Sequence, residues 1–304
     1  MKEYIEIDTN QVESMSPTSN LFENRCKLAE LKRGKHEVTL IVVAYNGLEK
    51  VKNCVESVLR YTKEINYELL LIDNGSADGT LEYFQSVECE HKRIIHITKN
   101  LGAFYPLMNV DFDSLGDFIC YLNNDSYVTP HWMDNLLTCI KSDSRIAMAS
   151  PMYSNPSYDI DDMTTLTFTS YEDMLQKAEQ YNVSDAKKWW DMVRPSTFCA
   201  LLRKEAILSI GWPYWDVGFY HKCADDDLGF RFRRMGYRTI KAGDTWVYHD
   251  HDMEQYQSSR NILDSGLKNF EEKYFGLTYK DFANFYFPYL RQFPAPAPAK
   301  KCLF

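Results

Sequence analysis

Residues Phe118–Asp125 have the sequence FICYLNND, an apolar run that ends in two amides and a carboxylate. An apolar run of this length is typical of a strand that is buried on both faces. In open α/β sheets, ligands bind at the carboxyl ends of the strands. We therefore expect Asp125 to lie at the ligand-binding edge of a sheet.

Three further apolar segments end in polar residues in the same way. Residues 38–43 lead into Ala44-Tyr45-Asn46, residues 68–72 lead into Asp73-Asn74-Gly75-Ser76, and residues 197–202 are followed downstream by Asp225-Asp226-Asp227. Because polar groups recur at strand ends, we predict one site that binds a charged ligand, with a metal ion as the expected bridge.

Helical and strand patterns alternate along the chain. Val51, Cys54, Val55 and Val58 recur at helical spacing and predict an amphipathic helix over 48–61. Further strands are expected at 93–97 and 146–149, and further helices around Leu81 and Phe84, from Pro130 and near 171–181. This alternation predicts an α/β fold with a mostly parallel sheet that is flanked by helices.

The chain divides into three predicted parts. Residues 1–36 are polar and lack strong periodicity, so we expect an appendage or a leading helix. The regular alternation spans 37–252 and is broken by an irregular insertion at 154–195, a length that is usually functional or mobile. Residues 253–304 are expected to form a helical, aromatic-rich extension, in which the Pro-Ala stretch 294–298 is typical of a linker to further domains.

Composition argues against several classes of function. The formal net charge of -9 disfavours nucleic acid as a partner and simple electrostatic adhesion to an anionic membrane. No apolar run approaches the ~20 residues of a membrane helix, and Met1–Glu6 lacks the features of a signal peptide. Eight cysteines without a CxxC pair indicate neither a zinc site nor a disulfide framework. We expect a reduced, cytoplasmic setting, with peripheral attachment at the inner face of the membrane left open.

A carboxylate and two imidazoles are candidates for the metal site. Asp125 offers the oxygen ligand that hard divalent cations prefer, although an isolated Asp at a strand end is more often a helix cap. His249 and His251 follow the apolar segment 245–247. A lone histidine is more often structural. Taken together, these residues predict a metal site that spans the sheet edge.

The acidic cluster Asp225, Asp226 and Asp227 opens a predicted helix. Acids favour helix N-termini, so ordinary helix electrostatics explains part of this cluster. Mutual repulsion raises the pKa of at least one of three adjacent carboxyl groups, which suits a general base. The cluster follows an aromatic stretch with Trp212 and Trp215. Aromatic rings beside carboxylates suit sugar recognition, and core packing is the common alternative.

Four motifs occur in a characteristic order along the chain. They are Val42–Asn46, Asp73–Thr80, Leu122–Asp125, and Asp225–Leu228 with Arg231 and Gly236-Tyr237. In this order and spacing they resemble the motifs of family 2 glycosyltransferases with the GT-A fold, over roughly residues 37–252. The resemblance implies that fold, the fold of nucleotide-diphospho-sugar transferases.

The resemblance also implies roles for individual residues. It assigns donor binding to residues at strand ends and in adjacent loops, namely Ala44, Tyr45, Asn46, Asp73, Asn74, Asn100, Gly102, Asn123 and Asn124. The family's Asp-x-Asp motif corresponds to residues 123–125, so Asp125 is the implied ligand of Mn²⁺ or Mg²⁺, with His249 or His251 beside it. The family's catalytic base aligns with Asp225, and Asp226 remains an alternative because Ala224 replaces the family's Glu. Trp212 and Trp215 are candidate acceptor contacts.

The implied activity is inverting transfer of a sugar from a UDP-, GDP- or dTDP-sugar to an acceptor hydroxyl, as in polysaccharide biosynthesis. Glycan, lipid-linked and protein acceptors stay open. A nucleotidyltransferase is one alternative, but it would carry a glycine-rich basic loop that residues 44–49 lack. A non-catalytic module that binds nucleotide sugars is the other alternative, and Asn123 in place of the family's first acid gives it some weight.

Overall fold

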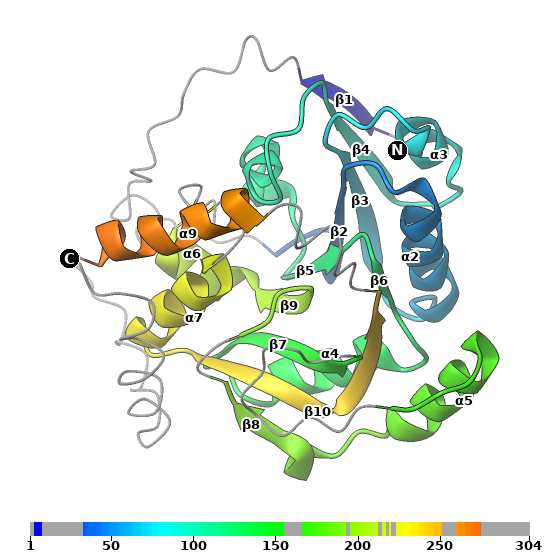
Figure 1. The fold of residues 1–304 in the computed structure, drawn as a ribbon. Helices are drawn as coiled ribbons and strands as arrows, with labels where there is room; N and C mark the ends of the chain where they lie inside the picture. The colour runs from blue at the N-terminus through cyan, green and yellow to red at the C-terminus, as the bar shows by residue number, and fades with distance from the viewer. Residues whose placement is uncertain are drawn as a thin grey trace.

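The computed structural model describes residues 3–7, 33–154, 166–192, 195–211, 215–216, 219, 223–250 and 260–274. These residues form one mixed sheet with helices on both faces (Figure 1). Trp212, His251, the Pro-Ala stretch 294–298 and most of the expected N-terminal appendage lie outside the described residues.

The described strands form a ten-stranded sheet in the order β1-β4-β3-β2-β5-β9-β7-β10-β6, with β8 paired to β10. Their bounds are β1 Glu3–Ile7, β2 Val38–Ala44, β3 Tyr67–Asp73, β4 Lys92–Ile97, β5 Phe118–Asn123, β6 Ser126–Tyr127, β7 Ile146–Tyr153, β8 Trp189–Asp191, β9 Cys199–Arg203 and β10 Arg238–His249.

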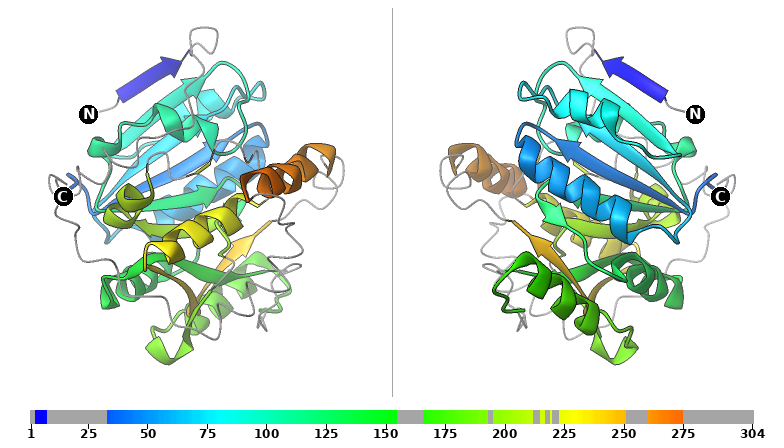
Figure 2. Two further views of the ribbon diagram at one scale, coloured as in Figure 1. Left: turned by 90° about the vertical axis from the view of Figure 1, so that its left-hand side faces the viewer. Right: turned by 90° about the vertical axis from the view of Figure 1, so that its right-hand side faces the viewer.

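The helices cover both faces of this sheet, as the two side views of Figure 2 show. Their bounds are α2 Leu48–Tyr61, α3 Thr80–Ser86, α4 Trp132–Ser142, α5 Tyr171–Tyr181, α6 Lys204–Ile210, α7 Ala224–Arg234 and α9 Arg260–Lys273, with short 3-10 helices η2 Tyr105–Asn109, η3 Phe112–Ser114 and η4 Ala186–Lys188.

The burial of β2 on both faces explains why its sequence is continuously apolar. Val38, Leu40 and Val42 pack in the hydrophobic core on the side of α2, α3 and α4. Ile41 and Val43 pack in the second core, on the side of α6, α7 and α9. A central parallel strand that is buried on both faces needs apolar residues at every position rather than at alternate ones.

Strand directions are more mixed than the sequence predicted. Strands β1 to β5 pair in parallel, but β9 is antiparallel to both β5 and β7, and β6 and β8 are antiparallel to β10. Residues 3–7, expected within an appendage or leading helix, instead form β1 and pair with β4. The insertion 154–195 contains α5, η4 and β8 among its described residues, so it is more regular than expected. The direction of a strand and its pairing at the edge of the sheet depend on strands that are distant in the sequence, so local sequence patterns do not predict them.

The short link between β5 and β6 requires the sheet to curl. These strands lie four strand spacings apart in the sheet order, about 19 Å in a flat sheet. Only Asn124 and Asp125 separate Asn123 from Ser126, and three Cα steps span at most about 11 Å. The sheet therefore bends until the end of β10 approaches the end of β5, and Asp125 lies at this junction.

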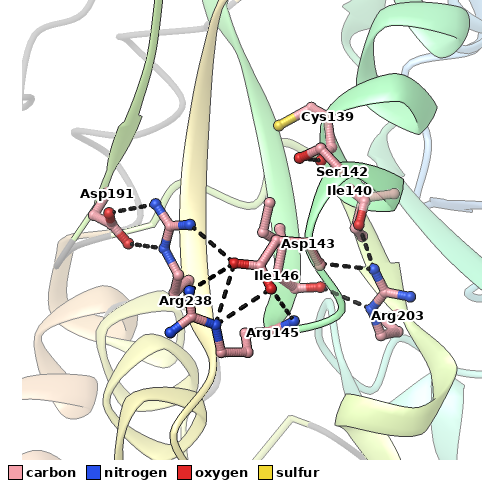
Figure 3. A network of polar contacts seen from close by, with 9 residues as sticks. All are labelled: Cys139, Ile140, Ser142, Asp143, Arg145, Ile146, Asp191, Arg203 and Arg238. Atoms are coloured by element: carbon pink, nitrogen blue, oxygen red, sulfur yellow. Dashed lines mark hydrogen bonds and ion pairs between the residues drawn. The ribbon is translucent and has the colours of Figure 1, made fainter. Parts of the chain in front are cut away.

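A network of ion pairs joins the starts of β7 and β10, the ends of these strands that lie away from His249 (Figure 3). Asp143 Oδ2 lies 2.8 Å from Arg145 Nη2 and 3.3 Å from Arg238 Nη1, and Arg238 Nη2 lies 2.7 Å from Asp191. Arg203 donates hydrogen bonds to carbonyl oxygens at the end of α4 and the start of β7. Hydrogen bonds lower the pKa of Asp143 to about 2, and the largest contribution comes from the side chain of Arg145.

We predict that Asp143→Asn lowers the free energy of unfolding at pH 7 by about 1–2 kcal/mol, because a charge-assisted hydrogen-bond network loses its anion. The pKa of Asp143 is lower in the folded protein than in the unfolded chain. Its contribution is therefore complete above the unfolded value and is lost as pH falls from about 4 to about 2. Urea titrations of both proteins across this range should show the difference shrinking. The exposed Glu64 gives the control Glu64→Gln, and a pH-independent difference would contradict the assignment.

Candidate active site

The carboxyl ends of four neighbouring strands are in register at one edge of the sheet. Ala44 of β2 pairs with Asp73 of β3, and Asp73 pairs with His96 of β4. Asn123 at the end of β5 pairs with Val43 on the other side of β2. The predicted donor-binding residues at the ends of β2, β3 and β5 thus lie along one edge, as parallel strands require.

Asp125 and His249 meet at the junction of β5, β6 and β10. His249 Nε2 lies 3.2 Å from Asp125 Oδ1, and the side chains are 9% and 22% exposed. The antiparallel pair of His249 with Ser126 and a hydrogen bond from Asp250 N to Asp125 O (2.8 Å) fix both backbones. The ring of Phe198 stacks on the His249 ring at 4.8 Å. The sequence prediction that these two residues lie together is consistent with this geometry.

The donor set at this junction fits a divalent cation. Asp125 Oδ1 is buried and makes no hydrogen bond within the described part of the chain, and an imidazole nitrogen lies next to it. A carboxylate oxygen and an imidazole nitrogen together suit Mn²⁺ or a similar metal. Among the described residues no group of three or more His, Cys, Asp or Glu gathers around one point. Within the described part of the chain, Asp125 and His249 are therefore the two candidate ligands at this junction.

Asp225 lies in the first turn of α7 and is connected to this junction through two consecutive residues. The hydroxyl of Thr197 donates a hydrogen bond to Asp225 Oδ1. Phe198, the next residue, stacks on His249 and accepts a hydrogen bond from Asn123 N at 2.7 Å. Burial raises the pKa of Tyr121, and the charges of Asp225 and Asp125 raise it further. Both carboxylates thus act on the same buried phenol.

The other acids of the cluster differ from Asp225. Asp227 is fully buried, and its carboxylate lies 2.8 Å from Arg231 Nε and 2.6 Å from Lys273 Nζ. The hydroxyl of Tyr274 also donates to it, at 2.6 Å. Asp227 therefore ties α7 to α9 and has a structural role. Asp226 is 6% exposed, whereas Asp225 is only partly buried.

Asn74 joins two loops at the donor side of the edge. Its amide nitrogen donates to Gly102 O (2.8 Å) and Asn100 Oδ1 (3.0 Å), and its oxygen accepts from Leu101 N (3.0 Å). Asn74 is 2% exposed, so its side chain holds the loop in place and leaves little surface for a ligand. A Cβ on Gly75 would lie 2.9 Å from Lys99 Cα, which shows how closely the loops approach.

The residues at the end of β2 and directly after it differ in exposure and in role. Ala44 is 1% exposed and packs in the core. Asn46 has a φ of 55°, and its side-chain oxygen accepts a hydrogen bond from Ala77 N at 2.9 Å, so it fixes the turn. Tyr45 is 46% exposed and leaves its ring free to contact a ligand. Asn123 and Asn124 are partly buried beside Asp125.

His96 was not among the sequence-predicted residues, although it contacts one of them. Its Nδ1 lies 2.7 Å from Asp73 Oδ2. Asp73 is 0% exposed, and its Oδ1 accepts a hydrogen bond from Ser76 N at 3.2 Å. A polar residue near the end of the predicted strand 93–97 was the available signal, but the sequence alone does not reveal its partner.

Trp215 belongs to the core rather than to an exposed surface. It is 1% exposed, and its ring stacks on Phe104 at 4.1 Å and contacts the edge of Tyr121 at 5.9 Å. The structure thus favours the packing alternative over acceptor contact for this residue, because the large apolar ring fills the second core. Trp212 and His251 lie outside the described residues.

The chain belongs to glycosyl transferase family 2, whose sequence model matches residues 39–211, more than half of its length. The described fold is the GT-A fold. It is similar to that of GalNAc-T7, solved with UDP, GalNAc and Mn²⁺, with a TM-score of 0.60 and 15% identity over 78% of this chain and 48% of that one. It is also similar to the mannosyltransferase PcManGT of Pyrobaculum calidifontis, solved with GDP-Man and Mn²⁺, with a TM-score of 0.56 and 16% identity over 88% and 76% of the chains.

Curated relatives match over shorter stretches. An uncharacterized glycosyltransferase of Haemophilus influenzae is 31% identical over 117 residues, 37% of this chain and 36% of the relative. The dolichol-phosphate mannosyltransferase of Pyrococcus furiosus is 25% identical over 115 residues, 38% of this chain and 33% of the relative. The matched stretch thus spans about a third of each of these relatives. Among the described helices, none combines the length and apolarity needed to cross a membrane.

We predict that Asp227→Ala lowers the free energy of unfolding by about 3–5 kcal/mol, because it leaves two cationic side chains beside an empty buried position. Asp225→Ala, two residues earlier in α7, is the matched variant because it removes the same charge. It should cost much less, about 0.5–1.5 kcal/mol for its hydrogen bond to Thr197. Urea denaturation followed by tryptophan fluorescence measures both. Equal losses would contradict the division of this cluster into structural and functional acids.

Proposed function

We propose that this chain is a metal-dependent, inverting glycosyltransferase that moves a sugar from a nucleotide-sugar donor to an acceptor hydroxyl. The observation that carries the proposal is the contact between Asp125 and His249 at the strand edge of a family 2 domain. Asp225, linked to the same junction through Thr197, supplies a second carboxylate for proton transfer.

The donor diphosphate is expected beside Asp125 and His249. These two residues, with His251 as a further candidate, would hold a divalent cation such as Mn²⁺ or Mg²⁺. When bound, such a cation acts as a Lewis acid that neutralises the leaving diphosphate. Two structures with the same fold were solved with Mn²⁺ together with UDP or GDP-Man, which supports a divalent metal and a nucleotide diphosphate.

The nucleoside end of the donor is expected along the ends of β2 and β3. Tyr45 offers an exposed ring, and Asn123 and Asn124 lie between this region and the diphosphate end. Asn46, Asn74, Asn100 and Gly102 hold the surrounding loops through their hydrogen bonds. We propose that these four residues support donor binding indirectly, by fixing the position of the loops around the donor.

Asp225 is the proposed general base. Its carboxylate accepts the proton of the acceptor hydroxyl as that hydroxyl attacks the anomeric carbon from the face opposite the leaving diphosphate. Thr197 donates a hydrogen bond to Asp225 Oδ1, which fixes the orientation of the carboxylate. A single displacement of this kind inverts the anomeric centre. The low exposure of Asp226 makes it the weaker candidate for this role.

Residues 37–252 form the proposed transferase domain, with the acceptor on the side of the insertion 154–195. Helix α5 in this insertion is attached to β10, since Trp246 N donates to Asn182 Oδ1 at 2.7 Å and the Tyr181 hydroxyl donates to Gly243 O at 2.8 Å. The insertion is thus fixed to the strand that ends in His249. A role in glycan or polysaccharide synthesis at a cytoplasmic site is part of this proposal.

We predict that Asp225→Asn lowers kcat by about 10²–10⁴-fold, the range that a general base contributes, while donor affinity is retained. The measurement is turnover of UDP-, GDP- and dTDP-sugars with Mn²⁺, together with calorimetric nucleotide affinity. Asp226→Asn is the control and should keep most of the turnover. Loss of turnover in Asp226→Asn, with turnover retained in Asp225→Asn, would show that the general base is Asp226 and not Asp225.

We predict that Asp125→Ala weakens Mn²⁺-dependent nucleotide binding by at least roughly tenfold, the loss that even outer-shell partners of a metal cause. Calorimetry with and without Mn²⁺ separates the metal-dependent part of the affinity. Asp134, an exposed acid on α4, provides the control Asp134→Ala. Unchanged Mn²⁺ dependence in Asp125→Ala would contradict the metal site.

A further inference from the structure

The contact between Asp73 and His96 determines which groups of these two side chains can bind a ligand. Asp73 Oδ2 lies 2.7 Å from His96 Nδ1, and Asp73 Oδ1 accepts the Ser76 N–H at 3.2 Å. Both oxygens of this carboxylate therefore have partners inside the protein, and the residue is 0% exposed. In this arrangement Asp73 has no surface to offer a ligand directly.

The same contact fixes the proton on the imidazole. An ionised carboxylate only accepts hydrogen bonds, so the ring nitrogen that faces it, Nδ1 of His96, carries the hydrogen. In the neutral ring Nε2 is then a hydrogen-bond acceptor. The His96 side chain is 16% exposed, and within the described part of the chain its one polar contact is the one to Asp73. Asp73 thus fixes the orientation of a ring that carries an acceptor nitrogen near the end of β4.

The surroundings of His96 suit a flat ring with polar edges. His96 is in register with Asp73, which in turn is in register with Ala44 of β2. Tyr45 follows Ala44 directly and is 46% exposed. An aromatic face at the end of β2 and an oriented acceptor at the end of β4, with β3 between them, are two elements that can hold a nucleobase, one by stacking and one by hydrogen bonding.

We infer that His96 binds the donor nucleobase by accepting its imide N–H at Nε2, with Asp73 as the residue that positions it. This inference rests on the proposed function, because it concerns the donor of that reaction. Uracil, thymine and guanine carry a ring N–H next to a carbonyl. Cytosine and adenine present a lone pair at the equivalent ring nitrogen, which would face the lone pair of Nε2. The site is therefore selective for UDP, dTDP or GDP over CDP and ADP.

The test is a calorimetric comparison of matched nucleotide pairs, UDP with CDP and GDP with ADP, in the presence of Mn²⁺. For at least one pair the wild-type chain should bind the imide nucleotide roughly tenfold more tightly, the contribution of one hydrogen bond. His96→Ala should lose this preference by weakening the imide nucleotide alone. His96→Gln, whose amide oxygen can replace Nε2 as an acceptor, should retain part of it.

His91, which directly precedes β4, provides the control. It lies at the opposite end of the strand from His96, its side chain is 34% exposed and its ring contacts the His36 ring at a tilt, so His91→Ala should keep the full preference. Thermal melting of each variant reports whether the fold is retained. Full preference in a folded His96→Ala, or a wild-type chain that binds CDP as tightly as UDP and ADP as tightly as GDP, would overturn this inference and leave the transferase proposal intact. A wild-type chain that binds none of the four nucleotides would overturn both.

Discussion

The 3.2 Å contact between Asp125 Oδ1 and His249 Nε2 joins two distant parts of the sheet at their common edge. It exists because only two residues connect β5 to β6, so the sheet curls until β10, the partner of β6, approaches the end of β5. A carboxylate with a buried oxygen and no hydrogen bond among the described residues is costly unless a cation or proton compensates it. The fold thus places a buried carboxylate oxygen beside an imidazole nitrogen, at the position proposed for the divalent metal.

Two consecutive residues position the proposed base and one of the proposed metal ligands. Thr197 holds Asp225, and Phe198 packs on His249, so one extended segment before β9 positions both sides of the proposed reaction. The antiparallel direction of β9 makes this possible, because it brings the start of that strand to the edge where the parallel strands end. Asp227 shows the contrasting case, in which an acid two residues from Asp225 serves packing through Arg231 and Lys273.

The sequence predicted the strand ends well because apolar runs followed by polar residues are local signals. Asp125 and His249 were expected to meet, and the order of the motifs gave the GT-A fold. What the sequence could not predict depends on distant partners: the edge strand β1, the reversed direction of β9, the contact of His96 with Asp73, and the burial of Trp215 against Phe104. Residues assigned to donor binding as one group also divide by exposure, from 46% at Tyr45 to 0% at Asp73.

The most direct test of the metal site is anomalous X-ray scattering from crystals of the chain grown with Mn²⁺ and a nucleoside diphosphate. We predict a manganese peak within coordination distance of both Asp125 and His249, with the diphosphate on its open side. A nucleotide bound at the strand edge without manganese at that position, or a manganese peak held by other residues, would contradict the proposed metal site.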